Sequence, residues 1–170
     1  IMDALDKPRV ANLKGKANLV TETDHLSEKT IKSIIRGSFP DHSFLAEESG
    51  QDLSKSDYLW IIDPLDGTTN FVHGYPSFAV SIALYYKNEP QVAVIIEMPN
   101  TKLYSAIKGE GVWCEGQPVS CSESDSLEKS LLVTGFGYEH GELWEENMRL
   151  YKHFTDTTQG VRRLGAAAVD

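Results

Sequence analysis

The spacing of apolar residues predicts a chain of helices and consecutive strands. Between Asp24 and Arg36 the apolar residues recur at helical spacing, which predicts a helix over 24–36 with Asp24 as its N-cap. Gly37 and Pro40 are expected to end this helix. The apolar positions that would form its buried face are Leu26, Ile31, Ile34 and Ile35.

Strands are predicted to follow one another through the middle of the chain. Residues 58–62 are a continuous apolar run, typical of a buried strand, that ends directly at Asp63. In residues 78–86, large apolar side chains alternate with mostly smaller ones, which predicts a half-buried strand, and residues 87–90 would turn the chain into the next one. Further strands are predicted over 43–46, 91–98, 103–107, 112–114 and 131–134.

A second amphipathic helix is predicted over about 142–154, with Leu143, Trp144, Met148, Tyr151 and Phe154 on its apolar face. Helices before and after a run of strands are typical of an α/β fold in which helices cover an antiparallel or mixed sheet. No repeat or linker divides the chain, which predicts one domain over residues 1–170. Residues 165–168 resemble the start of another helix, so we expect this domain to be incomplete at its C-terminus. The start at Ile1 rather than Met is consistent with a removed leader or tag.

Composition narrows the classes of function. The chain has 170 residues, of which 41% are hydrophobic and 24% charged, which is typical of a folded domain and not of disorder. No apolar run is long enough to span a bilayer, and no signal-peptide pattern opens the chain. The net charge of −9 argues against nucleic acid as a partner. An acidic protein can still bind phosphate if its carboxylates hold divalent cations that receive the anion.

The two cysteines, Cys114 and Cys121, are too few for a disulfide framework and fit a reducing compartment. They flank residues 115–118, which are typical of a hairpin turn. The two thiols could therefore face each other across a strand pair as a redox switch, or be two unreactive, partly buried thiols.

The segment 63–71, with the sequence DPLDGTTNF, is the strongest candidate for a site of chemistry. Asp63 and Asp66 lie where a buried strand is expected to give way to a loop that Pro64 stiffens. Their carboxylates and the Leu65 carbonyl offer three oxygen ligands of the kind that Mg²⁺ prefers. Gly67 would let the backbone approach a ligand closely, and a helix starting there would direct free N–H groups at an anion. The alternative is that Asp66 and Gly67 form only a turn and Asp63 only an N-cap.

Together with its surroundings, this segment resembles the first metal-binding signature of the inositol monophosphatase family. Three further stretches resemble the family in the same order: NLVTETD at 18–24, FLAEES at 44–49 and RLGAA at 163–167. The stretches VTGFGYEH at 133–140 and GVRRLG at 160–165 look most like the plastid-type enzymes of plants and their cyanobacterial relatives. The resemblance implies a layered αβαβα sandwich, of which this chain would supply the N-terminal helices, the main sheet and the start of the second half.

The resemblance also implies roles for individual residues. Metal would be held by Glu47, Asp63, Asp66 and the Leu65 carbonyl, with two or three Mg²⁺ ions at the site. Thr68, paired with Asp24, would orient and activate the attacking water, and Glu47 would also take part in catalysis. The N–H groups of Gly67 and Thr68 would receive the phosphate, and Gly165, Ala166 and Ala167 would approach the alcohol part of the substrate. Glu48, beside the proposed ligand Glu47, is expected on the solvated side.

The implied activity is hydrolysis of a small phosphorylated polyol, myo-inositol 1-phosphate first, with lithium sensitivity and a homodimer as further family properties. The protein would be in the chloroplast if it comes from a plant and otherwise in the cytoplasm. Sixteen positions separate Glu47 from Asp63, a short gap that favours a monophosphate over a bisphosphate substrate. The family's second signature, whose Asp completes the second metal site, is not in the chain, and Ala166 replaces a small hydroxyl residue that relatives often carry.

Competing interpretations remain open at this stage. Histidinol phosphate or another sugar phosphate is an alternative substrate, and a non-catalytic binding protein could retain the fold. The glycines at 135, 137 and 141 do not have the spacing of a dinucleotide loop. The five histidines lack zinc-site spacing, and no G-x-S-x-G elbow is present.

Overall fold

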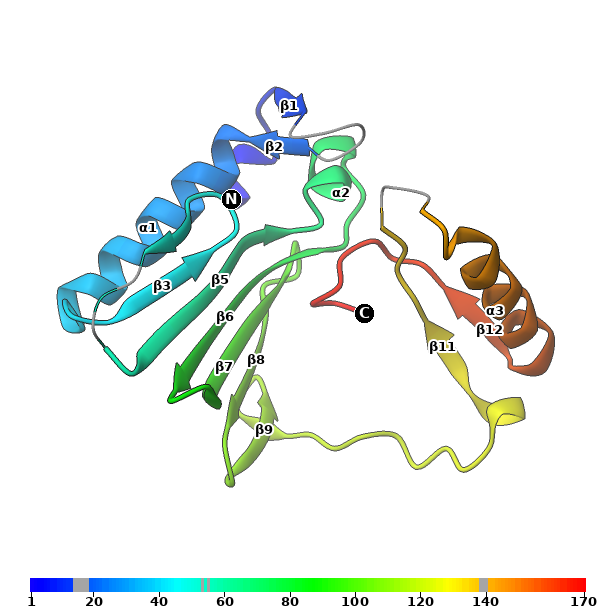
Figure 1. Cartoon of the computed structure of the whole chain (residues 1–170). Coiled ribbons are helices and arrows are strands. Elements are labelled where there is room, and N and C mark those ends of the chain that lie inside the picture. Colours follow the sequence, from blue (N-terminus) through cyan, green and yellow to red (C-terminus); the bar gives the residue numbers. More distant parts are fainter. Residues whose placement is uncertain (14–18, 53, 55, 138–140) are drawn as a thin grey trace.

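A mixed eight-stranded sheet forms the centre of the computed structural model, which describes residues 1–13, 19–52, 54, 56–137 and 141–170 (Figure 1). The strands lie in the order β10-β9-β8-β7-β6-β5-β3-β4. All neighbouring pairs are antiparallel except β3 and β5, which are parallel. The strands are β3 (Ser43–Ala46), β4 (Gly50–Asp52), β5 (Tyr58–Asp66), β6 (Phe78–Tyr86), β7 (Glu89–Met98), β8 (Lys102–Ile107), β9 (Gly111–Cys114) and β10 (Gln117–Pro118). The predicted α/β fold with helices on a mixed sheet is therefore confirmed.

The helix α1 (Glu22–Ser38) lies along β3 and β5 at one end of the sheet (Figure 1). Its N-cap is Thr21 and not the predicted Asp24, because the Thr21 side chain accepts from the Thr23 N–H while Asp24 accepts from the Thr21 N–H, in a capping box. The helix also continues through Gly37 and ends at Ser38.

Only part of the predicted apolar face of α1 is buried. Ile31 and Ile35 pack against a core of Phe44, Ala46 and Ile62, which β3 and β5 supply. Two other positions predicted for this face are exposed, Leu26 at 63% and Ile34 at 69%. The prediction was wrong there because α1 buries only a narrow stripe of its surface against the sheet. In the first half of the helix, this stripe consists of the polar residues Asp24, Ser27 and Glu28.

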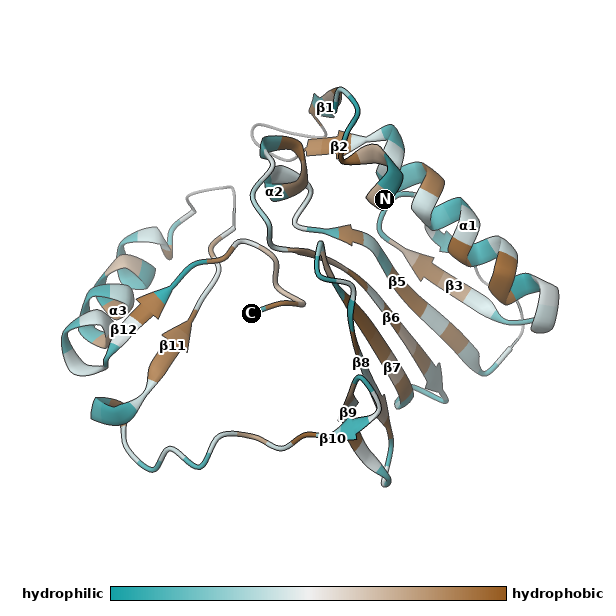
Figure 2. Ribbon diagram, turned by 180° about the vertical axis from the view of Figure 1, so that it is seen from behind, coloured by the Kyte–Doolittle hydropathy of each residue, from teal (hydrophilic) through white to brown (hydrophobic). Residues whose placement is uncertain are grey.

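A second core surrounds the short helix α2 (Thr68–His73). Leu65, Phe71, Phe78 and Met98 pack together there, and the partly buried N-terminal residues beside the 3-10 helix η1 (Met2–Ala4) pack against them. Figure 2 shows the apolar residues concentrated along β5, β6 and β7. This core joins the end of β5 to the start of β6 and so supports the segment between them.

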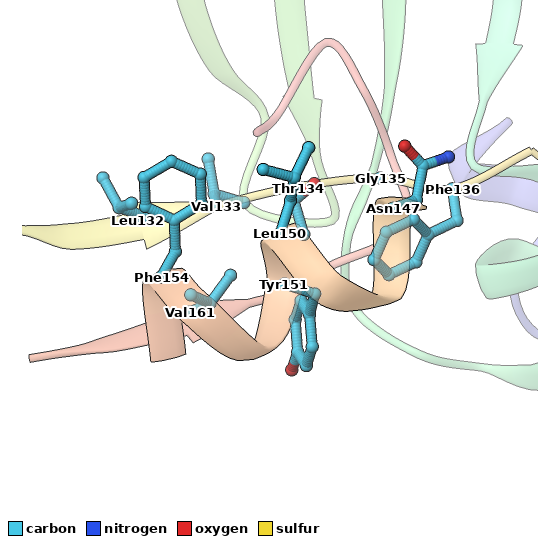
Figure 3. A pocket seen from close by; sticks show the side chains of 10 residues that line it. All are labelled: Leu132, Val133, Thr134, Gly135, Phe136, Asn147, Leu150, Tyr151, Phe154 and Val161. Carbon is cyan, nitrogen blue, oxygen red and sulfur yellow. The ribbon is translucent and has the colours of Figure 1, made fainter. Parts of the chain in front are cut away.

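The C-terminal part forms a separate small layer. Strands β11 (Leu131–Val133) and β12 (Gly160–Arg162) pair in parallel, and α3 (Trp144–Thr157) connects them and packs on β12. An apolar hollow between these elements is lined by residues that Figure 3 labels, among them Leu132, Phe154 and Val161. The predicted helix is confirmed, but it begins at Trp144, and Leu143 is exposed at 70%.

Several short elements were not predicted from periodicity: η1, β1 (Ala11–Leu13), β2 (Leu19–Thr21), β4, β10, β12 and the 3-10 helix η2 (Leu127–Lys129). In the β9–β10 hairpin, Cys114 lies opposite Gln117 and not opposite Cys121, and both cysteines are free. The helix expected to begin at 165–168 is a single turn whose N–H groups at Val169 and Asp170 both donate to the Ala166 carbonyl. Over the described ranges, no helix is long and apolar enough to cross a membrane.

Candidate active site

A bulge near the end of β5 brings Asp63 and Asp66 to one place. Asp63 lies opposite Ser81 and Asp66 opposite Ala79, so β5 has one more residue than β6 over this interval. In a regular strand, residues three apart point to opposite faces, and one extra residue removes that opposition. Pro64 is fully buried within the bulge, where a residue without an N–H is tolerated. The strand therefore continues to Asp66 rather than ending at Asp63, as was predicted from the apolar run.

Glu47 reaches the same place from the neighbouring strand. Because β3 runs parallel to β5 with Ala46 opposite Ile62, the next residue of each strand is an acid, and the Glu47 N–H donates to the Ile62 carbonyl at 3.2 Å. Glu47 is exposed, whereas Glu48 is partly buried, which corrects the expectation that Glu48 lies on the solvated side.

The three carboxylates affect one another electrostatically. The pKa of Asp63 is raised from 3.8 to about 7, chiefly by burial and then by the charges of Glu47 and Asp66 and a hydrogen bond with Glu47, against the lowering effect of a bond from the Leu65 N–H. Burial also raises the pKa of Asp66, which N–H groups of Ala168 and Ala167 partly oppose. Without a cation, this cluster is electrostatically unfavourable.

A buried hydrogen bond joins Asp24 to Thr68 beside this cluster. Asp24 is 1% exposed, and its Oδ1 accepts from Thr68 Oγ1 at 2.9 Å. Its Oδ2 accepts from both the N–H and the hydroxyl of Thr21, at 2.9 and 2.5 Å. The Leu65 carbonyl lies 3.0 Å from the same Thr68 hydroxyl. Asp24, the third residue of α1 and a member of its capping box, therefore also fixes the direction of a hydroxyl at the first position of α2.

The turn at Gly67 lies against the C-terminal segment. Gly67 has a φ of +84°, and a Cβ added there would lie 2.9 Å from the Cβ of Ala166, which is 1% exposed. Asn70 Nδ2 donates to the carbonyls of Leu164 and Ser77, each at 2.7 Å, and Asp66 Oδ2 accepts from the Ala168 N–H at 2.6 Å. Residues 164–168 are thus held beside Asp66 and Gly67, and the approach of Gly165, Ala166 and Ala167 to the alcohol part of a substrate stays a prediction.

The donor set suits a hard cation, because it offers carboxylate and carbonyl oxygens and neither sulfur nor imidazole. Across residues 1–13, 19–52, 54, 56–137 and 141–170, no three acidic, histidine or cysteine side chains converge closely enough to form a complete metal site. Glu47, Asp63 and Asp66 are near enough to perturb one another, and a cation would remove the repulsion that raises the pKa of Asp63.

Three polar residues that the sequence did not single out also contact this region. Ser27 donates to the Pro64 carbonyl at 2.9 Å, Glu28 accepts from backbone N–H groups next to Glu47, and Asn70 holds the C-terminal segment. The spacing of Asp24, Ser27 and Glu28 on one helix face is the signal that could have predicted the first two. Parts of two resembling stretches, namely Asn18 and residues 138–140, lie outside the described residues.

Comparison with known proteins identifies relatives of the whole chain. It is 51% identical over 177 residues to the chloroplastic phosphatase IMPL1 of Arabidopsis thaliana, covering 100% of this chain and 48% of that protein. It is 46% identical to an inositol-1-monophosphatase of Synechocystis, covering 92% of this chain and 55% of that protein. The crystal structure of the suppressor protein suhB from Bartonella henselae matches with a TM-score of 0.92 at 33% identity, covering 99% of this chain and 65% of that chain. The chain therefore spans about half the length of the curated relatives it matches. The inositol monophosphatase family model matches residues 1–170, and the chain belongs to that family.

Proposed function

We propose that this protein is a Mg²⁺-dependent phosphomonoesterase that acts on a small phosphorylated polyol, with inositol 1-phosphate as the first candidate. The observation that carries the proposal is the buried Asp24–Thr68 hydrogen bond beside a carboxylate cluster in which Glu47 and Asp66 help to raise the pKa of Asp63. A hydroxyl held by a buried carboxylate next to an oxygen-only cation site is the arrangement that water activation requires.

Each residue has a distinct part in the proposed reaction. Thr68 donates a hydrogen bond to Asp24 Oδ1, so a lone pair of its oxygen accepts a hydrogen bond from the attacking water; as the water loses a proton to Thr68, the hydroxyl proton of Thr68 would pass to Asp24. Two or three Mg²⁺ ions, held by Glu47, Asp63, Asp66 and the Leu65 carbonyl, would supply positive charge for the phosphate and for the departing alkoxide. The N–H groups of Gly67 and Thr68 open α2, where a helix leaves donors without partners inside the helix, and would bind the phosphate.

Segment 164–168 supports a polyol as the alcohol part of the substrate. Ala166 lies next to Gly67 and Gly165 next to Asn70, and the small side chains of residues 165–167 would leave mainly backbone groups to contact the substrate hydroxyls. A dual-specific inositol monophosphatase and NADP phosphatase, 25% identical with a TM-score of 0.80, was solved with D-inositol-1-phosphate bound. A structure of an inositol monophosphatase/NADP phosphatase was solved with NADP and Ca²⁺, and a staphylococcal inositol monophosphatase was solved as a LiCl-soaked inhibitory complex. These relatives support divalent-cation dependence, and we extend it to Mg²⁺ and to lithium inhibition.

The partners proposed for the intact protein rest on the family resemblance of its sequence. We propose a homodimer without nucleic-acid or membrane partners, located in the chloroplast if the source is a plant and in the cytoplasm otherwise. The chloroplastic relative from Arabidopsis supports the plastid location.

Phosphate release by the intact protein tests the proposal. Inositol 1-phosphate should be hydrolysed with Mg²⁺ and not with EDTA, and it should be preferred over histidinol phosphate, galactose 1-phosphate and fructose 1,6-bisphosphate. Thr68→Val should lower kcat about a hundredfold because it removes the hydroxyl, whereas Thr68→Ser should retain most of it. Full activity in EDTA, or equal activity of the two variants, would contradict the proposal.

A further inference from the structure

Glu28 is a buried carboxylate that the proposed reaction does not use. It is 4% exposed and lies one helical turn after Asp24 on the same face of α1. Its Oε2 accepts from the N–H of Glu48 at 2.8 Å and is 3.4 Å from the N–H of Ser49, which also donates to it. Both donors belong to the segment that carries Glu47.

That segment is the loop of a tight hairpin. Ala46 of β3 pairs with Gly50 of β4, so residues 47–49 form a three-residue connection. Gly50 has a φ of +70°, as expected for the left-handed residue that closes such a loop. The Glu47 N–H is held by β5 through the Ile62 carbonyl, and the next two N–H groups are held by Glu28. The backbone on both sides of the Glu47 side chain is thereby fixed.

If packing were the only requirement at position 28, an aliphatic side chain would stabilise the fold more than a buried carboxylate. One and two turns further along α1, Ile31 and Ile35 pack on Phe44 and Ile62 without buried charge. Burying a carboxylate costs free energy that its hydrogen bonds only partly return. What Glu28 provides, and an aliphatic residue would not, is a charged acceptor for adjacent loop N–H groups.

We propose that Glu28 is a positioning residue that sets the divalent-cation affinity of the site by fixing the loop that carries Glu47. This inference rests on the proposed function, because it takes Glu47 as a cation ligand. Groups that orient a metal ligand without touching the metal commonly change the affinity by about 10- to 100-fold when they are removed. Glu28 acts through the backbone of the loop and not through contact with substrate.

The test compares cation binding with turnover in the intact protein. Glu28→Ala should weaken binding of Mg²⁺ by calorimetry, and of Mn²⁺ by electron paramagnetic resonance, about tenfold or more. At saturating Mg²⁺, kcat and the KM for inositol 1-phosphate should stay within about threefold of the wild type. Glu22→Gln is the matched control, because it removes the same charge from an exposed position of the same helix, and it should change neither quantity.

Glu28→Gln keeps the shape and one acceptor, so it tests the idea even if Glu28→Ala does not fold. It should weaken Mn²⁺ binding about threefold and speed amide hydrogen exchange at Glu48 and Ser49. Wild-type cation affinity and wild-type exchange in this variant would overturn the inference, as would a loss of kcat in Glu28→Ala at unchanged cation affinity. If the wild-type protein itself binds no Mn²⁺ and hydrolyses nothing, the proposed function fails, and the role of Glu28 fails with it.

Discussion

Replacing Asp63 with Asn should make the cation-free protein more stable and the enzyme less active. Burial and neighbouring charges raise the pKa of Asp63 from 3.8 to about 7. At about 1.4 kcal/mol per pH unit, this corresponds to at most about 4 kcal/mol of unfavourable free energy above pH 7. Because Asp63 is only partly buried, solvent screening reduces this unfavourable free energy to about 2 kcal/mol.

The raised pKa of Asp63 also makes the stability of the cation-free protein depend on pH. Between pH 3.8 and about 7 the folded protein retains a proton at Asp63 that the unfolded chain has released, so the folded state binds more protons. Stability of the cation-free wild type should therefore fall as pH rises through this window, whereas Asp63→Asn should lose this part of the dependence. Asn can still accept the hydrogen bond that the Leu65 N–H donates to Asp63 Oδ1.

Thermal unfolding by calorimetry between pH 5 and 8 measures the pH dependence of stability in the wild type and in Asp63→Asn. In EDTA at pH 8, Asp63→Asn should raise Tm by about 4–8 °C, and saturating Mg²⁺ should stabilise the wild type more than the variant. Asp57→Asn is the control, because it makes the same change at an exposed aspartate just before β5 and should shift Tm by less than about 2 °C. A variant less stable than the wild type in EDTA at pH 8 would refute the claim that the acids repel one another.

Two further predictions concern neighbouring positions. Asp66→Asn should lower kcat about a hundredfold at saturating Mg²⁺, since it removes one charge from the proposed second cation site. Glu48→Gln should change kcat/KM less than about threefold in the same steady-state kinetics. The reverse order of effects would mean that the ligands are misassigned. Gly67→Ala should destabilise the fold by about 2 kcal/mol or more in urea unfolding, because φ is +84° and the added Cβ would lie 2.9 Å from the Ala166 Cβ. The control Gly37→Ala adds a Cβ in open space within α1 and should be neutral or stabilising. Equal effects of the two variants would contradict the close approach of Gly67 to Ala166.

The sequence predicts the regular parts of this fold because their patterns follow directly from local burial. Strand β6 (Phe78–Tyr86) has the predicted bounds, since its larger and smaller residues alternate as on a half-buried strand. The bulge after Asp63 could not be predicted, because it depends on the register with Ser81 and Ala79 of the next strand. The prediction that Asp63 and Asp66 lie together came from segment 63–71 and not from periodicity.

At the candidate site, the buried position of Glu28 could not be predicted from the sequence. In a helix rich in charged residues, a Glu followed by Lys29 is typical of a solvated surface. The partners of Glu28 are backbone N–H groups 20 and 21 positions away, which become neighbours only when the hairpin has folded. Asp24 was predicted as a site residue through family resemblance, whereas its part in the capping box depends on Thr21, which the apolar pattern did not indicate.

The polar stripe on the first half of α1 has a consequence for how the region opens. Asp24 contacts the start of α2 through Thr68, Ser27 contacts the β5 bulge, and Glu28 contacts the β3–β4 loop. Three segments distant in sequence are therefore attached to one helix, whose second half is anchored in the core by Ile31 and Ile35. Asp24 and Glu28 are buried, so the segments that they hold cannot detach fully while α1 stays in place without breaking a hydrogen bond of a buried carboxylate. The start of α2, the β5 bulge and the β3–β4 loop should accordingly unfold together with α1 as one cooperative unit. Each of these segments then has the local stability of the whole helix rather than that of a surface turn.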